Sequence, residues 1–84
     1  MHKKVVIYTK ANCPYCGWTK ELLDSEHISY AEIRVDLDPE VREEMEQLSH
    51  RKTVPQIFIG DRHVGGFDDL KALYDSGEFH SWLK

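Results

Sequence analysis

Both cysteines of this 84-residue chain stand in one tetrapeptide, Cys13-Pro14-Tyr15-Cys16. Two thiols three positions apart can be inert buried side chains, half of a zinc site, or a dithiol that opens and closes as a disulfide. Inert burial fits poorly, because Cys13 follows Asn12 and precedes Pro14, which are residues typical of a loop before a helix. The pair is therefore predicted to do chemistry.

A zinc site would need two more ligands at a suitable spacing. The chain has no second C-x-x-C motif, and no two histidines are separated by three to five residues. The histidines downstream of the cysteines stand singly, at His27, His50, His63 and His80. Redox chemistry is therefore favoured over metal binding, and no bound metal is expected.

The spacing of the two cysteines suits a redox pair. Residues i and i+3 in the first turn of a helix have Cβ atoms about 5–6 Å apart, and a small adjustment brings them to the ~3.5–4.5 Å of a disulfide. A sulfur at the helix start is stabilised as a thiolate by free N–H groups and the helix dipole. Cys13 is therefore predicted to attack, and Cys16, one turn further in, to resolve. Lys10 either adds positive charge near Cys13 or lies in solvent at a strand end.

The elements around the cysteines follow from the apolar pattern. Residues 4–9 form a continuous β-branched and aromatic run, which predicts a strand covered on both faces. Pro14 suits a first helical position, and Trp18, Leu22 and Leu23 follow at helical spacing. Residues 30–35 alternate between apolar and polar types, which predicts a half-exposed strand.

The second half of the chain predicts a further helix, a hairpin and a last helix. Asp38 is expected to cap a helix that begins at Pro39, with Val41, Met45 and Leu48 as one apolar stripe packed in the core. Residues 55–60 and 62–65 are predicted strands joined by a tight turn at Gly60-Asp61. A helix near 67–74 and an apolar tail at 79–83 complete the chain.

The order β-α-β-α-β-β-α defines an α/β fold. Two strands joined by a helix run parallel with a right-handed crossover, and the final pair closes as an antiparallel hairpin. The prediction is one mixed four-stranded sheet flanked by helices, in a single domain spanning residues 1–84. In a β-α-β setting, a C-x-x-C motif is typical of a thioredoxin-like redox site.

Composition restricts the class of protein. With 40% hydrophobic and 31% charged residues, the chain is typical of soluble globular proteins. A net charge of −4 argues against a nucleic-acid partner. No segment reaches the ~20 apolar residues of a membrane span, so no membrane association is expected. The apolar run after Lys3 and Lys4 is too short for a secretory signal, so the protein is expected in the cytoplasm. Cations near the cysteines or the TVP stretch leave room for a small anionic partner; they are Lys10, Lys20, Arg51 and Lys52.

Three motifs together resemble a known family. "CPYC" at 13–16, "TVPQIFI" at 53–59 and "HVGGFDDL" at 63–70 are similar, in order and spacing, to those of dithiol glutaredoxins, and the likeness covers nearly the whole chain. The resemblance implies a monomeric glutaredoxin domain with the thioredoxin fold. It also implies a glutathione-dependent thiol–disulfide oxidoreductase that reduces glutathione mixed disulfides and protein disulfides.

The resemblance also implies where glutathione binds. The Val54-Pro55 bond is expected to be cis, with the Val54 backbone pairing with the cysteinyl part of glutathione and Thr53 beside it. After Gly66, the N–H groups of Phe67 and Asp68 open a helix and are expected to take the γ-glutamyl carboxylate. The Asp68 side chain would face the γ-glutamyl amine.

Three further residues match family positions. Lys10 and Arg42 are implied to approach the glycyl carboxylate, and Tyr15 to pack beside the sulfur. Arg42 is also an ordinary arginine for a helix surface. The chain departs from the family at Phe67, where many relatives carry a third cysteine, and at Gly17 and Trp18, which are less usual there.

Two other functions fit part of the pattern. A thioredoxin-like hydrogen donor would be reduced by a flavoprotein reductase, but Lys10 and the "GGFDD" helix start argue for glutathione. An iron–sulfur cluster between two protomers would use the first cysteine and glutathione. Pro14 and the second cysteine argue against it.

Overall fold

The computed structural model describes residues 2–84, so Met1 of the predicted domain lies outside the described residues. The strands of this part of the chain are β1 (Val5–Thr9), β2 (Ala31–Arg34), β3 (Gln56–Ile59) and β4 (Arg62–Gly65). The helices are α1 (Pro14–Ser25), α2 (Pro39–Ser49), α3 (Phe67–Asp75) and α4 (Phe79–Leu83). The predicted order is confirmed, and the apolar tail at 79–83 is a short helix with Phe79 and Leu83 buried.

The strands form one mixed sheet in the order β2-β1-β3-β4. Strand β1 runs parallel to β2, with Val6 opposite Ala31, and antiparallel to β3, with Val5 opposite Ile59. Strands β3 and β4 are an antiparallel hairpin whose turn contains Gly60 at φ +59°. The predicted parallel crossover and hairpin are therefore both confirmed.

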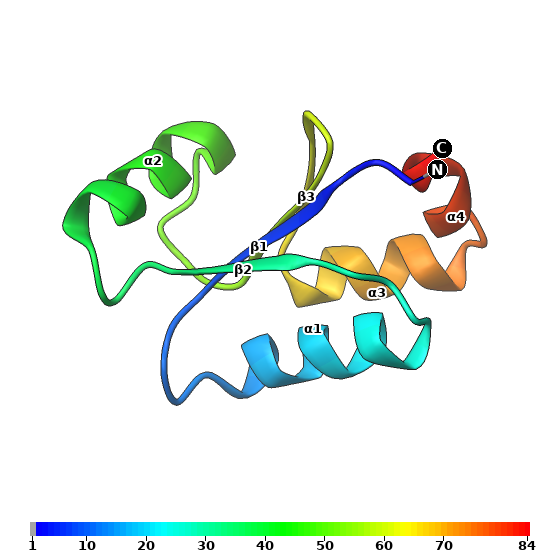
Figure 1. The fold of residues 1–84 in the computed structure, drawn as a ribbon, viewed down its shortest axis with the longest axis horizontal. Coiled ribbons are helices and arrows are strands. Elements are labelled where there is room, and N and C mark those ends of the chain that lie inside the picture. Colours follow the sequence, from blue (N-terminus) through cyan, green and yellow to red (C-terminus); the bar gives the residue numbers. More distant parts are fainter. Residues whose placement is uncertain (1) are drawn as a thin grey trace.

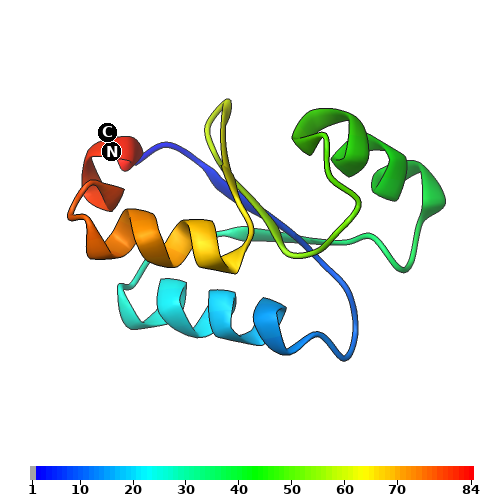
Figure 2. The same ribbon diagram turned by 180° about the vertical axis from the view of Figure 1, so that it is seen from behind.

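The helices cover the two faces of the sheet unequally. Helices α1 and α3 lie side by side on one face, and α2 lies on the other (Figure 1). Seen from behind, α4 lies beside the segment that leads into β1 (Figure 2), and the Lys3 N–H donates to Leu83 O at 2.7 Å. No helix among residues 2–84 is long and apolar enough to cross a membrane.

The alternation of side chains along β1 separates two apolar cores. Val5 and Ile7 belong to the core under α1 and α3, whereas Tyr8 belongs to the core under α2. The larger core contains Val5, Ile7, Leu23, Ile57, Ile59, Leu70, Phe79 and Leu83. The smaller core contains Tyr8, Val35, Met45 and Phe58. The side of the sheet that carries α1 and α3 is thus the better filled.

Helix α2 begins as predicted but does not bury its whole apolar stripe. The Glu40 N–H donates to Asp38 Oδ1 at 2.9 Å, and Pro39 occupies the first turn. Met45 is fully buried and Val41 packs beside it, but Leu48 is 52% exposed, so its predicted place in the core is wrong. Leu48 instead borders an open hollow over the sheet, because α2 covers only part of that face.

Helix α1 places Trp18 off its buried face. Cys16, Thr19 and Leu23 are its buried residues, and their spacing of three and four positions defines the face turned to the sheet. Trp18, which the sequence analysis placed only at helical spacing with Leu22 and Leu23, falls beside that face and is 47% exposed. Its ring packs on side chains near the two cysteines instead.

Candidate active site

The start of α1 is capped by a sulfur. Cys13 is the N-cap residue, with extended backbone angles, and the Cys16 N–H donates to Cys13 Sγ at 3.2 Å. Pro14 occupies the first turn, where the missing N–H costs no hydrogen bond. Cys13 and Cys16 form a disulfide, with their Cα atoms 5.2 Å apart. The sequence-predicted pair is therefore joined at the start of a helix.

The two sulfurs differ in access. The Cys13 residue is half-buried, whereas Cys16 is only 2% exposed and faces the sheet with Thr19. A bulky disulfide can therefore approach Cys13 but not Cys16. Cys13 is thus the sulfur that is open to a substrate, and the attacking and resolving roles stay predictions.

The loop before β3 runs past the reactive sulfur. The Val54-Pro55 peptide bond is cis, as the resemblance predicted. The Val54 carbonyl oxygen lies 4.0 Å from Cys13 Sγ. Thr53 is exposed and Pro55 is buried, so the loop turns inward at the proline.

A buried glutamine holds this loop. Gln56 is fully buried, and its Nε2 donates to Thr53 O at 3.0 Å and to Thr53 Oγ1 at 3.4 Å. Its Oε1 lies 2.7 Å from His63 Nε2, so the histidine ring donates there. Burial, and then the nearby Arg51 charge, lower the pKa of His63. Gln56 was not among the predicted site residues, although an amide directly after Pro55 in an otherwise apolar strand was a visible signal.

The start of α3 has a different cap. Gly66 is its N-cap residue and, lacking a side chain, cannot accept from the first turn; the Gly66 N–H donates instead to Asp69 Oδ2 at 2.9 Å. Gly65 has φ +122°, and a Cβ there would overlap the Asp69 carboxylate. The N–H groups of Phe67 and Asp68 lie in the first turn, which has no intrahelical acceptor for them. Such N–H groups can bind an anion, and the contact with a γ-glutamyl carboxylate that the resemblance implied stays a prediction.

An ion pair links this helix start to the loop before β3. Arg51 Nη1 donates to Asp69 Oδ2 at 2.9 Å, although both side chains are nearly half exposed. The Arg51 hydrogen bond, and then the Gly66 N–H, hold the pKa of Asp69 below its usual value. Neither residue was predicted as part of the site. Arg51 was visible only as a cation near the TVP stretch.

A hollow of about 210 Å³ lies between these elements. Seven sequence-predicted residues line it: Tyr15, Thr53, Val54, Pro55, Gly66, Phe67 and Asp68. Arg51 and Asp69 complete the lining. The structure therefore brings together the residues of all three motifs.

Two of the residues predicted to bind glutathione do not line this hollow. The Arg42 guanidinium donates to Lys52 O at 2.9 Å and pairs with Glu46 at 3.2 Å, along the surface of α2. Lys10 is exposed just after β1. Their contacts with the glycyl carboxylate stay predictions.

Three aromatic rings stand beside the disulfide. The ring centroids of Tyr15 and Trp18 are 4.9 Å apart, and Phe67 lies 6.3 Å from Tyr15 and 5.8 Å from Trp18. We call Tyr15, Trp18 and Phe67 the aromatic cluster. It joins the first turns of α1 to the start of α3.

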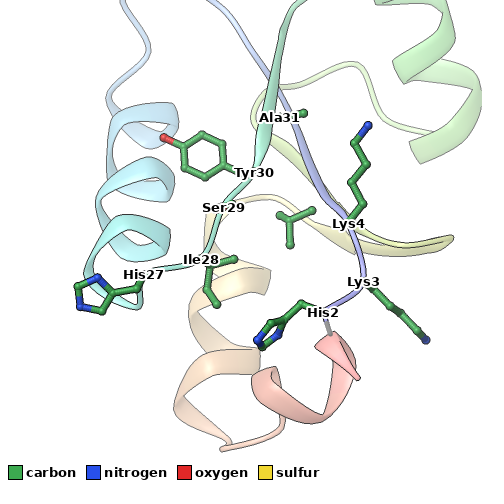
Figure 3. Close-up of a pocket in the computed structure, with 9 residues that line it drawn as sticks. His2, Lys3, Lys4, His27, Ile28, Ser29, Tyr30 and Ala31 are labelled. Atoms are coloured by element: carbon green, nitrogen blue, oxygen red, sulfur yellow. The ribbon is translucent and has the colours of Figure 1, made fainter.

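A larger hollow, of about 420 Å³, is lined by residues 2–5 and 27–31 and contains no cysteine. Figure 3 shows His2 beside it, while Lys3, Lys4 and His27 point in different directions. Its cationic groups therefore do not converge on one point. The smaller hollow, by contrast, is lined by Tyr15 and by Val54, whose carbonyl oxygen lies 4.0 Å from Cys13 Sγ.

Known proteins similar to this chain are glutaredoxins. The family model "Glutaredoxin" matches residues 5–64. Over 80 residues the chain is 50% identical to glutaredoxin 3 of Escherichia coli K12, covering 95% of this chain and 96% of that protein. The solution structure of glutaredoxin from Brucella melitensis superposes with a TM-score of 0.87 at 49% identity, covering 99% of this chain and 90% of that one. A crystal structure of a buckwheat glutaredoxin–glutathione complex superposes with a TM-score of 0.88 at 28% identity, covering 96% and 76%.

Proposed function

Because the chain belongs to the glutaredoxin family, with the thioredoxin fold, and is a thiol–disulfide oxidoreductase, we propose that glutathione is its reducing co-substrate. Its substrates would be glutathione mixed disulfides and protein disulfides. One observation carries this proposal: Cys13 Sγ caps α1 and lies beside Val54, which lines the same hollow as the open start of α3. One tripeptide can join these two points.

The helix start favours Cys13 as a leaving group. Lowering the pKa of a thiol from ~8.5 to ~5 raises its thiolate fraction at neutral pH about thirtyfold. With a Brønsted slope of ~0.45, its nucleophilicity falls about fortyfold over the same range, so the two effects nearly cancel. A stabilised thiolate leaves readily when another thiol attacks the sulfur bonded to it. The site is therefore suited to release its bound glutathione.

Glutathione mixed disulfides need only the first cysteine. The Cys13 thiolate attacks the glutathione sulfur, a new Cys13–glutathione disulfide forms, and the substrate leaves as a thiolate that takes up a proton. A second glutathione thiolate attacks the glutathione sulfur bonded to Cys13. Oxidised glutathione leaves, and the Cys13 thiolate returns to the cap of α1.

Protein disulfides need both cysteines. Cys13 forms a mixed disulfide with one substrate sulfur, and the other substrate sulfur leaves as a thiolate. Cys16 then attacks Cys13 Sγ, which releases the reduced substrate and forms the Cys13–Cys16 disulfide. Two glutathione molecules reduce that bond and become oxidised glutathione.

Glutathione would lie in the 210 Å³ hollow. The Val54 backbone would pair with its cysteinyl residue with Thr53 alongside, while the Phe67 and Asp68 N–H groups take the γ-glutamyl carboxylate and the Asp68 side chain takes the amine. Support comes from the shared lining of this hollow, to which Gly66, Pro55 and Tyr15 also belong. Contacts of Lys10 and Arg42 with the glycyl carboxylate stay predictions, and Arg42 would first have to leave Glu46.

The setting of the reaction is part of the proposal. One sheet carries both apolar cores, which supports a single domain, and we expect it to act as a monomer. Reduction by glutathione requires a compartment with a reduced glutathione pool, which supports the cytoplasm.

Turnover with alternative reductants tests this function. The protein is assayed on a mixed disulfide of glutathione with a small thiol, with either glutathione and glutathione reductase or a thioredoxin reductase as the electron source. We expect turnover only with glutathione. Efficient reduction of the protein by thioredoxin reductase, without added glutathione, would favour a thioredoxin-like donor.

A further inference from the structure

We infer that the aromatic cluster of Tyr15, Trp18 and Phe67 is a docking surface for protein substrates. It would take an aromatic side chain next to the substrate cysteine that bonds to Cys13. The inference rests on the proposed reduction of protein disulfides and adds a preference among them.

Two members of the aromatic cluster are more exposed than most large apolar side chains of the described residues. Among residues 2–84, four large hydrophobic residues are strongly exposed, and Tyr15 and Trp18, at 50% and 47%, stand together. The other two, Leu37 and Leu48, are far from Cys13 in the sequence, and Leu48 lies on α2. Phe67 from α3 extends the pair into a patch of three rings.

The cluster continues from the catalytic hollow onto the outer surface. Tyr15 and Phe67 line the hollow beside Val54, whereas Trp18 does not. Glutathione in the hollow would therefore touch the inner rings and leave the Trp18 ring free. Trp18 is thus the member that can recognise a protein substrate without serving the glutathione site.

The chemistry brings a substrate chain to this patch. A disulfide holds its two Cα atoms about 4.4–6.8 Å apart, and each further residue of an extended chain adds about 3.3–3.6 Å. The residues next to a substrate cysteine bonded to Cys13 therefore lie within reach of the aromatic cluster, whose first ring, Tyr15, is two residues after Cys13. An apolar side chain at that point would cover surface that is otherwise in water.

The packing of the rings favours an aromatic partner. Tyr15 and Trp18 meet edge to face at an interplanar angle of 80°, and Trp18 and Phe67 are inclined at 58°. Such an arrangement can be extended by one more ring in an edge-to-face or offset contact, which gains affinity beyond the area it buries. An aliphatic or polar neighbour lacks this additional gain.

The test compares two peptides, each with one intramolecular disulfide. They differ only in the residue that follows each of their two cysteines, which is Phe in one peptide and Ser in the other. The reduced protein attacks through Cys13, and each turnover converts one peptide disulfide to a dithiol as the protein dithiol becomes the Cys13–Cys16 disulfide. We expect kcat/KM for the Phe peptide to exceed that for the Ser peptide by about three- to tenfold, the range of one aromatic contact.

Substitutions at Trp18 locate the preference. Trp18→Gln should remove it by raising KM for the Phe peptide, and Trp18→Phe should keep most of it. Leu48→Gln, which changes a similarly exposed residue on α2, should leave it intact. All three variants should turn over a small glutathione mixed disulfide like the wild type. That control separates this inference from the proposed function, whose failure would instead appear as no turnover of the small substrate by the wild type.

Two results would overturn the inference. One is equal kcat/KM for the two peptides, or a preference that Trp18→Gln leaves unchanged. The other is a dimer in sedimentation experiments that Trp18→Gln abolishes, because a second copy of this chain would then be what covers the cluster.

Discussion

Helices α1 and α3 begin beside the same hollow, but their first turns are capped in opposite ways. At α1, the Cys16 N–H donates to Cys13 Sγ, so an atom of the protein itself caps the helix. At α3, Gly66 has no side chain, and the Asp69 carboxylate bonds backward to the Gly66 N–H. The first-turn N–H groups of Phe67 and Asp68 are thereby left for an anion from outside.

This difference assigns one task to each helix start. A sulfur that caps a helix gains stability as an anion, so it can accept and release a disulfide partner. A glycine that caps a helix contributes no anion, so the same N–H groups and dipole can bind a carboxylate. Under the proposed function, we expect the chemistry at the start of α1 and the recognition of glutathione at the start of α3.

Removal of each cysteine is expected to give the largest effect. Cys13→Ser should reduce turnover of a glutathione mixed disulfide to the uncatalysed rate, because the other cysteine, Cys16, is too buried to attack. Cys16→Ser should keep activity on that substrate and lose it on protein disulfides. A coupled assay with both substrates measures this, and the reverse ranking would exchange the two roles.

Removal of one N–H from α3 tests the recognition half. Phe67→Pro deletes that group at the first helical position, where proline is tolerated, and Gly66 already has the extended backbone that precedes a proline. KM for glutathione should rise about tenfold, the loss expected for one hydrogen bond to a charged group. Phe67→Ala loses the ring but keeps the N–H, so it should bind glutathione more tightly than Phe67→Pro. Equal KM values for the two variants would contradict the role of the N–H.

Breaking the Arg51–Asp69 pair should have a smaller effect. Asp69→Asn weakens both the Arg51 contact and the bond to the Gly66 N–H, so the α3 start should lose order and KM for glutathione should rise a few-fold. Arg51→Gln removes only the exposed ion pair, which is worth no more than ~1 kcal/mol. Titration calorimetry compares the affinities of the two variants for glutathione. If Arg51→Gln bound glutathione more weakly than Asp69→Asn, the bond from Asp69 to the Gly66 N–H would not be what orders the start of α3.

The acid stability of the fold should show the smallest effect. The folded pKa of Asp69 is lowered, so its contribution to the free energy of unfolding is present above the unfolded value of ~3.9 and is lost as pH falls toward the folded pKa. Urea midpoints of the wild type and Asp69→Asn should therefore differ more at pH 5 than at pH 2. A constant difference across this range would show that Asp69 does not titrate as described.

Sequence patterns were sufficient for the fold and for the cysteine pair. The apolar runs, Asp38, the two prolines at helix starts and Gly60 each act locally, so the bounds of the elements follow from neighbouring residues. The cis bond before Pro55 came from the family resemblance, because proline alone gives it a low probability.

Most of the missed features depend on how separate elements pack together. Arg51 meets Asp69 across 18 positions, so that contact has no local signal. Gln56 meets His63 across the β3–β4 hairpin, and the polar residue in an otherwise apolar strand was visible although its partner was not. Trp18 and Leu48 follow the helical period, but periodicity does not report where the neighbouring layer ends. Coverage of a helix face is decided only in the assembled fold.

One measurement tests the division of tasks between α1 and α3 most directly. Amide chemical shifts of the Cys16→Ser protein are recorded before and after glutathione is attached to Cys13. We expect the largest changes beyond the cysteine itself at the amides of Phe67, Asp68 and Val54. If the α3 amides keep their shifts while Cys13 carries glutathione, the tripeptide does not join the two helix starts.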